Sequence, residues 1–243
     1  MTPDFETTWR RRFEEFGRDY DDDAAIAGWS ETGLQARFRN FARSWRPDGV
    51  GDVWLDAGCG AGTYARLMAA SGQHVIALDY SMPSLIKARR RSGEGPSISW
   101  VVGDVTRLPL GPRSCDGAIC FGVLQALGSP TRAISELARV VRPGGQVWVD
   151  ALNASSLPKL AGHILAKARR EEERLRYDSP RRLTQAFREA GFGDISLMWV
   201  PILPGRVKGM QDAFQSAIAR TLFARLPWLG SAVSHAYVLS ARR

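Results

Sequence analysis

Three aspartates lie in or directly after three successive apolar runs, and a glycine-rich turn follows the first run. That run, 53–57, contains Asp56 and leads into Gly-Cys-Gly-Ala-Gly at 58–62. Asp79 ends the second run, HVIALD, and Asp104 follows the third run, in VVGDV. A glycine-rich turn lets a ligand approach bare backbone, and a helix that begins there directs free N–H groups at it. These residues predict a ligand site at the ends of neighbouring strands.

The spacing of the glycines helps to identify the ligand. A dinucleotide fingerprint needs Gly-x-Gly-x-x-Gly, whereas the third glycine here comes one residue early and Thr63 stands in its place. Asp56 would repel a pyrophosphate but suits a cationic amine. Asp79 can accept hydrogen bonds from both ribose hydroxyls, and Asp104 can accept from the exocyclic amine of adenine, with the Val105 N–H beside it for a ring nitrogen. Anchors for an amine, a ribose and an adenine together fit S-adenosylmethionine (SAM).

Hydrophobic periodicity predicts the elements that position these residues. Apolar side chains at three- and four-residue spacing over 5–45 predict a helical cap, in which the acidic run Asp21–Asp23 is interpreted as a solvated turn. Trp9 and Trp29 of this cap are candidates for substrate contact. From Val53 onward, β-branched runs alternate with helical stretches, which is typical of a parallel α/β sheet with helices on both faces. Strands are expected at 53–58, 74–79, 98–104, 116–122, 146–152, 195–200 and 236–240, and helices at 64–71, 82–90, 131–141, 157–176, 180–190 and 210–222.

Five segments carry a resemblance to a known family. They are LDAGCGAGTYA, ALDYSMPSLIKAR, GDVTRLPL, CDGAICFGVLQAL and ARVVRPGGQVWV, and they cover about 53–151 of the chain. As a set they resemble class I SAM-dependent methyltransferases, within the small-molecule group that includes the ubiquinone/menaquinone-biosynthesis type (methyltransferase type 11). The resemblance implies an α/β, Rossmann-like, seven-stranded sheet with helices on both faces, mostly parallel, with the last strand antiparallel between the fifth and sixth. It also implies a helical N-terminal cap, helical lid insertions, and methyl transfer that leaves S-adenosyl-L-homocysteine.

The same resemblance implies a set of cofactor-binding residues. The methionine moiety would be held by Asp56, Gly58, Gly60 and the backbone near Cys120, with Cys59 and Gly62 in the same turn. The ribose would be held by Asp79, and the adenine by Tyr80, Met82, Asp104 and Val105. Tyr20 would lie near the carboxylate end of the cofactor.

The chain departs from many relatives just after the fourth strand, where Gln125 and Ala126 stand in place of one or two histidines. No general base carries over at that point. If the acceptor is a hydroxyl, His235 at the site end of the last strand and His163 in the lid are the candidate bases; a carboxylate or phenolate acceptor needs none. The segment 120–123 also replaces the Asn-Pro-Pro-Tyr box of base-flipping N-methylases, which argues against that group.

The excess positive charge lies at one end of the chain. Residues 1–150 carry 18 basic and 18 acidic side chains, whereas 151–182 carries 8 against 4 and 201–234 carries 4 against 1. Both basic segments have apolar helical stripes and, in the resembled sheet, leave strands at the ligand-bearing edge. We therefore expect a basic, amphipathic lid and an acceptor that is apolar and anionic, such as a lipid, polyketide, quinone precursor or lipid-linked sugar, with O-methylation favoured. A peripheral membrane contact by 206–229 is a lesser expectation.

Length and composition set the class of protein. The 243 residues are 44% hydrophobic and 24% charged, which suits one folded domain. We expect a cap at 1–48, a SAM-binding core at 49–152, lid segments at 153–182 and 201–234, and the rest of the sheet at 183–200 and 235–243. No apolar run approaches the roughly 18 residues of a membrane span, so a cytoplasmic protein is expected. Three cysteines without metal-ligand spacing predict neither disulfides nor a metal site.

Three other interpretations stay open on the sequence alone. A SAM-binding protein without catalysis would keep the same cofactor residues but lack an acceptor pocket. An RNA methyltransferase would use the basic segments to hold phosphates, although no appended RNA-binding module is present in the sequence. A nicotinamide-dependent oxidoreductase is disfavoured by the glycine spacing.

Overall fold

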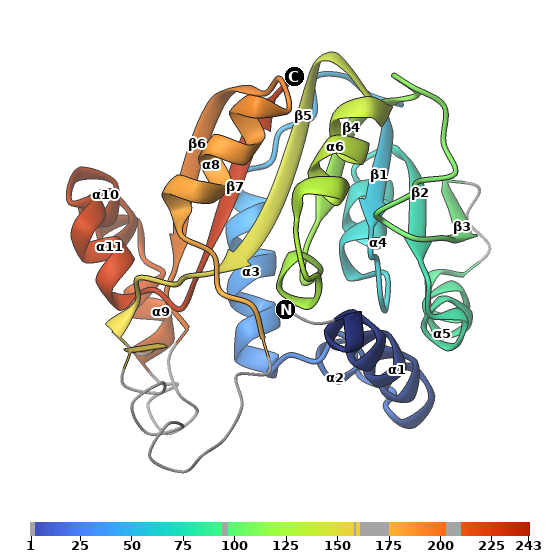
Figure 1. Ribbon diagram of the computed structural model, residues 1–243, viewed down its shortest axis with the longest axis horizontal. Helices are drawn as coiled ribbons and strands as arrows, with labels where there is room; N and C mark the ends of the chain where they lie inside the picture. Colours follow the sequence, from blue (N-terminus) through green and yellow to red (C-terminus); the bar gives the residue numbers. More distant parts are fainter. Residues whose placement is uncertain (1–2, 94–96, 158, 161–174, 203–209) are drawn as a thin grey trace.

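The computed structural model describes residues 3–93, 97–157, 159–160, 175–202 and 210–243. Its centre is a seven-stranded sheet in the order β3-β2-β1-β4-β5-β7-β6 (Figure 1). The strands are β1 Val53–Ala57, β2 His74–Asp79, β3 Ile98–Val102, β4 Cys115–Cys120, β5 Val141–Leu152, β6 Gly193–Val200 and β7 Ala236–Arg242. β1 to β5 pair in parallel, and β7 pairs antiparallel with both β5 and β6. The predicted fold class is confirmed, including the place of the last strand.

Helices cover both faces of the sheet, as Figure 1 shows. The helical elements are α1 Pro3–Asp19, α2 Asp23–Ile26, α3 Glu31–Ser44, α4 Thr63–Ala70, α5 Met82–Ser92, η1 Leu124–Ala126, α6 Thr131–Val140, α8 Pro180–Glu189, α9 Gln211–Phe214, α10 Ala217–Arg225 and α11 Pro227–Val233. Side chains of α6 and α8, such as Leu137 and Phe187, pack in one buried cluster. Those of α3, α4 and α5, such as Phe41, Met68 and Leu85, pack in a second cluster. The sheet therefore lies between two apolar layers, as β-branched strands buried on both faces require.

The cap formed by α1, α2 and α3 reaches the edge of the sheet where the parallel strands end. α3 is anchored by Phe41, whose ring lies 5.4 to 5.6 Å from those of Trp45, Phe121, Trp148 and Tyr64. α1 packs along α5 instead, and Figure 1 shows it beside the carboxyl ends of β1 and β2. The cap thus closes over the predicted ligand site.

Three expectations about the elements need correction or fall outside the structure. The fifth strand begins at Val141, before Pro143, and a register shift opposite Cys115 and Gly117 accommodates the additional residues. The expected helix 210–222 is divided into α9 and α10, because Ser216 caps a new helix by accepting a hydrogen bond from the Ala219 N–H. The expected helix 157–176 lies mostly outside the described residues.

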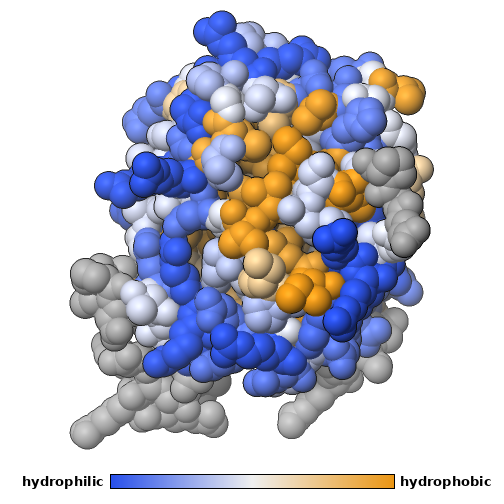
Figure 2. Space-filling view, turned by 90° about the vertical axis from the view of Figure 1, so that its right-hand side faces the viewer, coloured by the Kyte–Doolittle hydropathy of each residue, from blue (hydrophilic) through white to orange (hydrophobic). Residues whose placement is uncertain are grey.

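Two surface properties bear on function. Among the described residues, no helix is long and apolar enough to cross a membrane. Figure 2, which faces the edge of the sheet formed by β3, shows hydrophobic side chains gathered on this side of the molecule between hydrophilic ones. On α5 and β3 the exposed large apolar side chains are Met82, Ile86 and Val102.

Candidate cofactor-binding site

A cleft of about 930 Å³, partly open to solvent, lies between the cap and the carboxyl ends of β1, β2 and β4. Seven residues predicted to bind the cofactor line it, namely Gly58, Cys59, Gly60, Asp79, Tyr80, Asp104 and Val105. The cap contributes Glu6, Trp9, Arg10, Phe13, Asp23 and Trp29. The structure therefore brings residues distant in the sequence to the same cleft. Glu6, for example, binds Gly128, which is 122 positions away and follows the lining residue Leu127.

The glycine turn forms the floor of the cleft and is held by the neighbouring strand. The Gly58 and Cys59 N–H groups both donate to the Leu78 carbonyl, at 2.7 and 2.9 Å. Gly58 has φ +82°, and a Cβ there would lie 2.2 Å from the Val123 Cγ2. A side chain at this position would therefore be strained and would collide with the loop after β4. α4 begins directly after Gly62, so its first N–H groups face the turn.

Asp79 lies at the end of β2 and orders the same turn. Its Oδ2 accepts the Gly60 N–H at 2.8 Å, and its Oδ1 accepts the Ser81 N–H at 2.8 Å. Burial raises the pKa of Asp79, and the backbone N–H groups oppose that rise by stabilising the carboxylate. Each carboxylate oxygen can accept a second hydrogen bond, which leaves Asp79 able to bind a ligand diol.

Asp56 is fully buried behind the turn and is not part of the cleft wall. Within the described part of the chain, its Oδ2 has no hydrogen-bond partner. Burial first, and then the charge of Asp79, raise the pKa of Asp56 to about 8. An unpartnered buried acceptor beside a second carboxylate favours a proton or a cationic group in its neighbourhood.

The raised pKa of Asp56 predicts a pH dependence of stability. The folded protein holds the proton on the Asp56 carboxyl more tightly than the unfolded chain does. The stabilisation that this proton provides is complete at acid pH and is lost as the pH rises toward about 8. Asp56→Asn keeps the shape without the charge, so we expect it to increase the free energy of unfolding relative to wild type at pH 8.5 but not at pH 4. Urea unfolding of both proteins at the two pH values measures this, and an identical difference at both would contradict it.

Asp104 is bound from the opposite side of the cleft by α1. Arg10 Nη2 forms an ion pair with Asp104 Oδ2, and the Thr106 N–H and hydroxyl donate to Oδ1 at 2.8 and 2.7 Å. Partial burial alone would raise the pKa of Asp104, but these donors outweigh it and lower the pKa. At the other side, Glu6 Oε1 accepts the Gly128 N–H at 2.7 Å. α1 therefore bridges both walls of the cleft, an arrangement that the sequence analysis missed.

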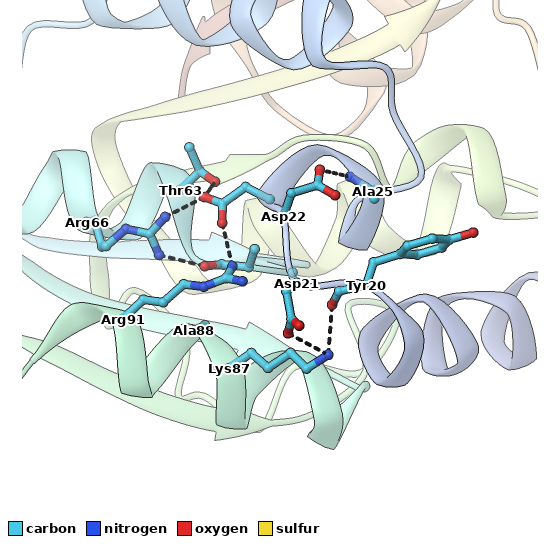
Figure 3. A network of polar contacts seen from close by, with 12 residues as sticks. Tyr20, Asp21, Asp22, Ala25, Thr63, Arg66, Lys87, Ala88 and Arg91 are labelled. Atoms are coloured by element: carbon cyan, nitrogen blue, oxygen red, sulfur yellow. Dashed lines mark hydrogen bonds and ion pairs between the residues drawn. The ribbon is translucent and has the colours of Figure 1, made fainter.

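The acidic run at the start of α2 corrects one expectation. Asp23 is not a solvated turn residue, since its carboxylate accepts hydrogen bonds from Thr63, Arg66 and Arg91 (Figure 3). Arg66 Nη1 also donates to the Ala61 carbonyl at 2.6 Å, within the glycine turn. Asp21, by contrast, is exposed and contacts only Lys87 among the interactions drawn in Figure 3. Asp23 therefore ties the cap to the turn and to α5.

Asp23→Ala should loosen the cap. The change leaves two partly buried guanidinium groups and the Thr63 hydroxyl without their shared acceptor, and we expect a loss of about 1–3 kcal/mol of stability together with weaker SAM binding. Asp21→Ala is the matched control, because its side chain is 91% exposed and its ion pair with Lys87 contributes about 0–1 kcal/mol. Thermal unfolding and isothermal titration with SAM measure both effects. Equal behaviour of the two variants would show that Asp23 does not hold the cap.

The far end of the cleft is apolar and is supported by a buried ion pair. Trp29 and Phe121 line it, and the Arg37 guanidinium lies 4.4 Å above the centre of the Trp29 ring. Arg37 Nε donates to Asp150 Oδ2 at 2.6 Å, while Asp150 Oδ1 accepts the Gly122 N–H at 2.6 Å. The two charged side chains are 3% and 0% exposed. This pair fixes the loop after β4 and the indole of the cap that packs on it.

Several predicted cofactor residues lie away from the cleft wall. Tyr20 is exposed and its ring packs on Phe16, while its carbonyl accepts a hydrogen bond from Lys87 Nζ (Figure 3). Met82 is also exposed, at the start of α5. Gly62 ends the glycine turn and Cys120 ends β4, but neither lines the cleft.

Of the two candidate bases, His235 does not line the cleft. His235 precedes β7, and its ring meets that of Tyr177 edge to face at 5.8 Å between centroids. Burial, and then the charge of Arg37, lower the pKa of His235 to about 4. Its imidazole is therefore neutral at pH 7 but weakly basic. His163 lies outside the described residues.

The fold is the Rossmann-like fold of solved methyltransferase structures. Its seven-stranded sheet has β7 antiparallel between β5 and β6. Residues 55–149 match the family model described as a methyltransferase domain.

Curated relatives match the same core. A malonyl-[acyl-carrier protein] O-methyltransferase of Serratia marcescens is 38% identical over 112 residues, which are 45% of this chain and 42% of that protein. A demethylmenaquinone methyltransferase of Clavibacter sepedonicus is 36% identical over 110 residues, which are 45% of this chain and 44% of that protein. The chain thus spans less than half the length of these two relatives.

Solved structures share the fold over nearly the whole chain. A chain from the complex of the Haloferax volcanii Trm112 methyltransferase activator with its methyltransferase has a TM-score of 0.67 at 19% identity, covering 95% of this chain and 96% of that one. Phosphoethanolamine N-methyltransferase 2 of Haemonchus contortus, solved with SAM, has a TM-score of 0.66 at 18% identity, covering 98% of this chain and 60% of that one. At these identities the likeness concerns the fold.

Proposed function

We propose that this protein transfers a methyl group from SAM to a small-molecule or lipid-like acceptor. The observation that carries the proposal is the meeting of the glycine turn, Asp79 and Asp104 in one cleft at the carboxyl ends of successive strands. The methyltransferase-domain match over residues 55–149 supports it independently.

The residues in the cleft fit the chemical groups of SAM. A Cβ on Gly60 would meet nothing within 4 Å, so the turn leaves open space over bare backbone for the methionine moiety. Behind the turn, a bound cationic amine would favour the charged form of Asp56, whose Oδ2 has no hydrogen-bond partner in the described residues. Asp79 would accept from the ribose hydroxyls, and Asp104, with the Val105 N–H, would bind the adenine edge. The remaining predicted residues, Cys59, Gly62, Tyr80, Met82, Cys120 and Tyr20, stay predictions for the same site.

The acceptor would enter the apolar end of the cleft. Trp29, Leu34, Phe121 and Leu127 line that end, which suits an apolar or conjugated group. We propose that an anionic part of the acceptor faces the basic segment 153–182 instead, because Arg10, the one cation of the cleft lining in the described residues, is already paired with Asp104. The relatives named malonyl-[acyl-carrier protein] O-methyltransferase and demethylmenaquinone methyltransferase support O-methylation or a quinone-type acceptor.

Bound SAM would supply a methyl group attached to a positively charged sulfur. The chain's own contribution would be to hold the acceptor in line with that bond and to exclude water, which the closed cap and the aromatic walls favour. A phenolate or carboxylate acceptor loses no proton and needs no base. Because His235 is weakly basic and lies outside the cleft, we expect His235→Ala to leave turnover unchanged, and His163→Ala tests the second candidate base in the same assay.

The proposal is tested by methyl transfer from radiolabelled SAM into extract fractions, separated into organic-soluble, aqueous, nucleic-acid and protein material. Asp79→Ala should abolish labelling, while Asp21→Ala, outside the cleft lining, should retain it. Label in the organic phase would support an apolar acceptor. Label in nucleic acid would instead favour an RNA methyltransferase. SAM binding without label in any fraction would favour a SAM-binding protein without catalysis.

A further inference from the structure

The exposed apolar side chains are concentrated far from the cofactor cleft. Of the twelve exposed large apolar residues in the described chain, seven belong to 157–160 and 210–228. They are Leu157, Leu160, Met210, Ile218, Leu222, Leu226 and Trp228. Asn153 Nδ2 donates to the Ser231 and Ser234 carbonyls at 2.8 and 3.0 Å, which ties the chain four residues before the first segment to the end of α11. The two segments therefore lie on the same side of the molecule.

The helices α10 and α11 lie beyond β6, at the opposite edge of the sheet from β3 and α5 (Figure 1). α10 buries only Phe223 and turns Ile218 and Leu222, four residues apart, to solvent. Ile218 is 82% exposed, and Trp228 at the start of α11 is 68% exposed. Such exposure of large apolar side chains in one region is typical of a surface that meets a partner.

The charges of this region are positive. Arg220 and Arg225 are exposed on α10, and within the described chain neither has an ion pair or hydrogen bond through its side chain. The only acidic residue between 210 and 243 is Asp212. Its carboxylate is already paired with Arg39, at 2.6 Å. Over 210–243, the surface thus combines apolar side chains with arginines and has no acidic group free to repel an anion.

We propose that α10 and α11 bind the surface of a membrane that contains anionic lipid. Exposed aliphatic side chains and a tryptophan would enter the boundary between headgroups and acyl chains, and the two arginines would meet the lipid phosphates. The high exposure of Ile218 and Trp228 favours a lipid surface over an acidic protein, because side chains that stand this far out of the surface can enter the boundary between headgroups and acyl chains. The proposal does not depend on methyl transfer, since it concerns a surface separate from the cleft.

Co-sedimentation with vesicles tests the proposal directly, using phosphatidylcholine vesicles with and without phosphatidylglycerol, at low and high salt. We expect the full chain to bind the vesicles with phosphatidylglycerol, and high salt to weaken that binding. Arg220→Gln and Arg225→Gln should each weaken binding about fivefold, in line with the attraction of one basic residue to an anionic leaflet. Ile218→Ser combined with Trp228→Ser should weaken it by roughly tenfold or more, because two apolar anchors are lost.

Matched controls lie on α5, at the other end of the sheet. Arg89→Gln and Ile86→Ser change an exposed arginine and an exposed apolar residue there, and they should leave vesicle binding unchanged. Circular dichroism and SAM binding check that every variant is folded. The proposal is overturned if the protein does not bind vesicles with phosphatidylglycerol, or if the α10 and α11 variants bind them as well as the controls do. An acidic protein would then be the partner to seek.

Discussion

Gly58→Ala is expected to destabilise the protein by about 2–5 kcal/mol, since a left-handed backbone strains alanine by about 1–2 kcal/mol and overpacking costs about 1–3 kcal/mol more. The overpacking arises because the new methyl group would lie 2.2 Å from the Val123 Cγ2. Relief of that collision would push the glycine turn and the loop after β4 apart. We therefore also expect SAM affinity to fall by at least about tenfold, which is about 1.4 kcal/mol.

Gly60→Ala separates the two causes. Gly60 also has a left-handed backbone, with φ +50°, but a Cβ there would meet nothing within 4 Å. Without ligand this variant should lose only the backbone component, about 1–2 kcal/mol. SAM binding should still suffer, because the methyl group would occupy the space proposed for the cofactor. The double variant Gly58→Ala/Val123→Ala should recover the part of the stability that the collision costs. Equal unfolding free energies for Gly58→Ala and Gly60→Ala would contradict the collision.

Arg37→Met should destabilise the protein by about 3–5 kcal/mol, a loss similar to that of Gly58→Ala, because it leaves a buried carboxylate without its partner. Asp150 is fully buried, and its remaining hydrogen bond, from the Gly122 N–H, does not neutralise its charge. The double variant Arg37→Met/Asp150→Asn keeps an acceptor for Gly122 and removes both charges. We expect it to be more stable than Arg37→Met alone, as measured by urea unfolding.

The exposed pair Arg242 and Asp48 provides the comparison for the buried one. Its two side chains are 43% and 44% exposed, and its closest contact is 2.9 Å. Arg242→Met should cost about 0–1 kcal/mol, the usual range for a surface ion pair. If Arg37→Met cost no more than Arg242→Met, the buried pair would not be what fixes the loop after β4 and the indole of Trp29.

Much of the fold could be predicted because its signals are local. Short apolar runs rich in β-branched residues located all seven strands, and the resemblance gave the antiparallel place of β7. The start of β5 was the exception, because Pro143 and Gly144 indicate a break while the register shift opposite β4 absorbs it. Of the candidate site, the turn and the strand-end aspartates were predictable, since each sits at a fixed offset from a strand.

The cap side of the cleft was not predictable in the same way. Arg10 and Asp104 are 94 residues apart, and nothing in the local pattern of either indicates the other. Asp23 looked solvated because it follows two other aspartates, and only the folded chain brings Arg66 and Arg91 to it. A signal for the buried pair did exist. Asp150 interrupts the apolar strand QVWVDAL, and Arg37 shares the apolar helix face of Leu34 and Phe41, so each required a partner in the core.

The bridge that α1 makes across the cleft has a consequence for the proposed cofactor. Asp104 already has a ligand, the guanidinium of Arg10, which is held on the same chain at high effective concentration. An adenine amine that used this carboxylate would compete with that internal ligand. The measured affinity for SAM would then equal the intrinsic affinity multiplied by the fraction of molecules in which Arg10 has released Asp104. Arg10 would in this way act as an intramolecular competitor of SAM for Asp104.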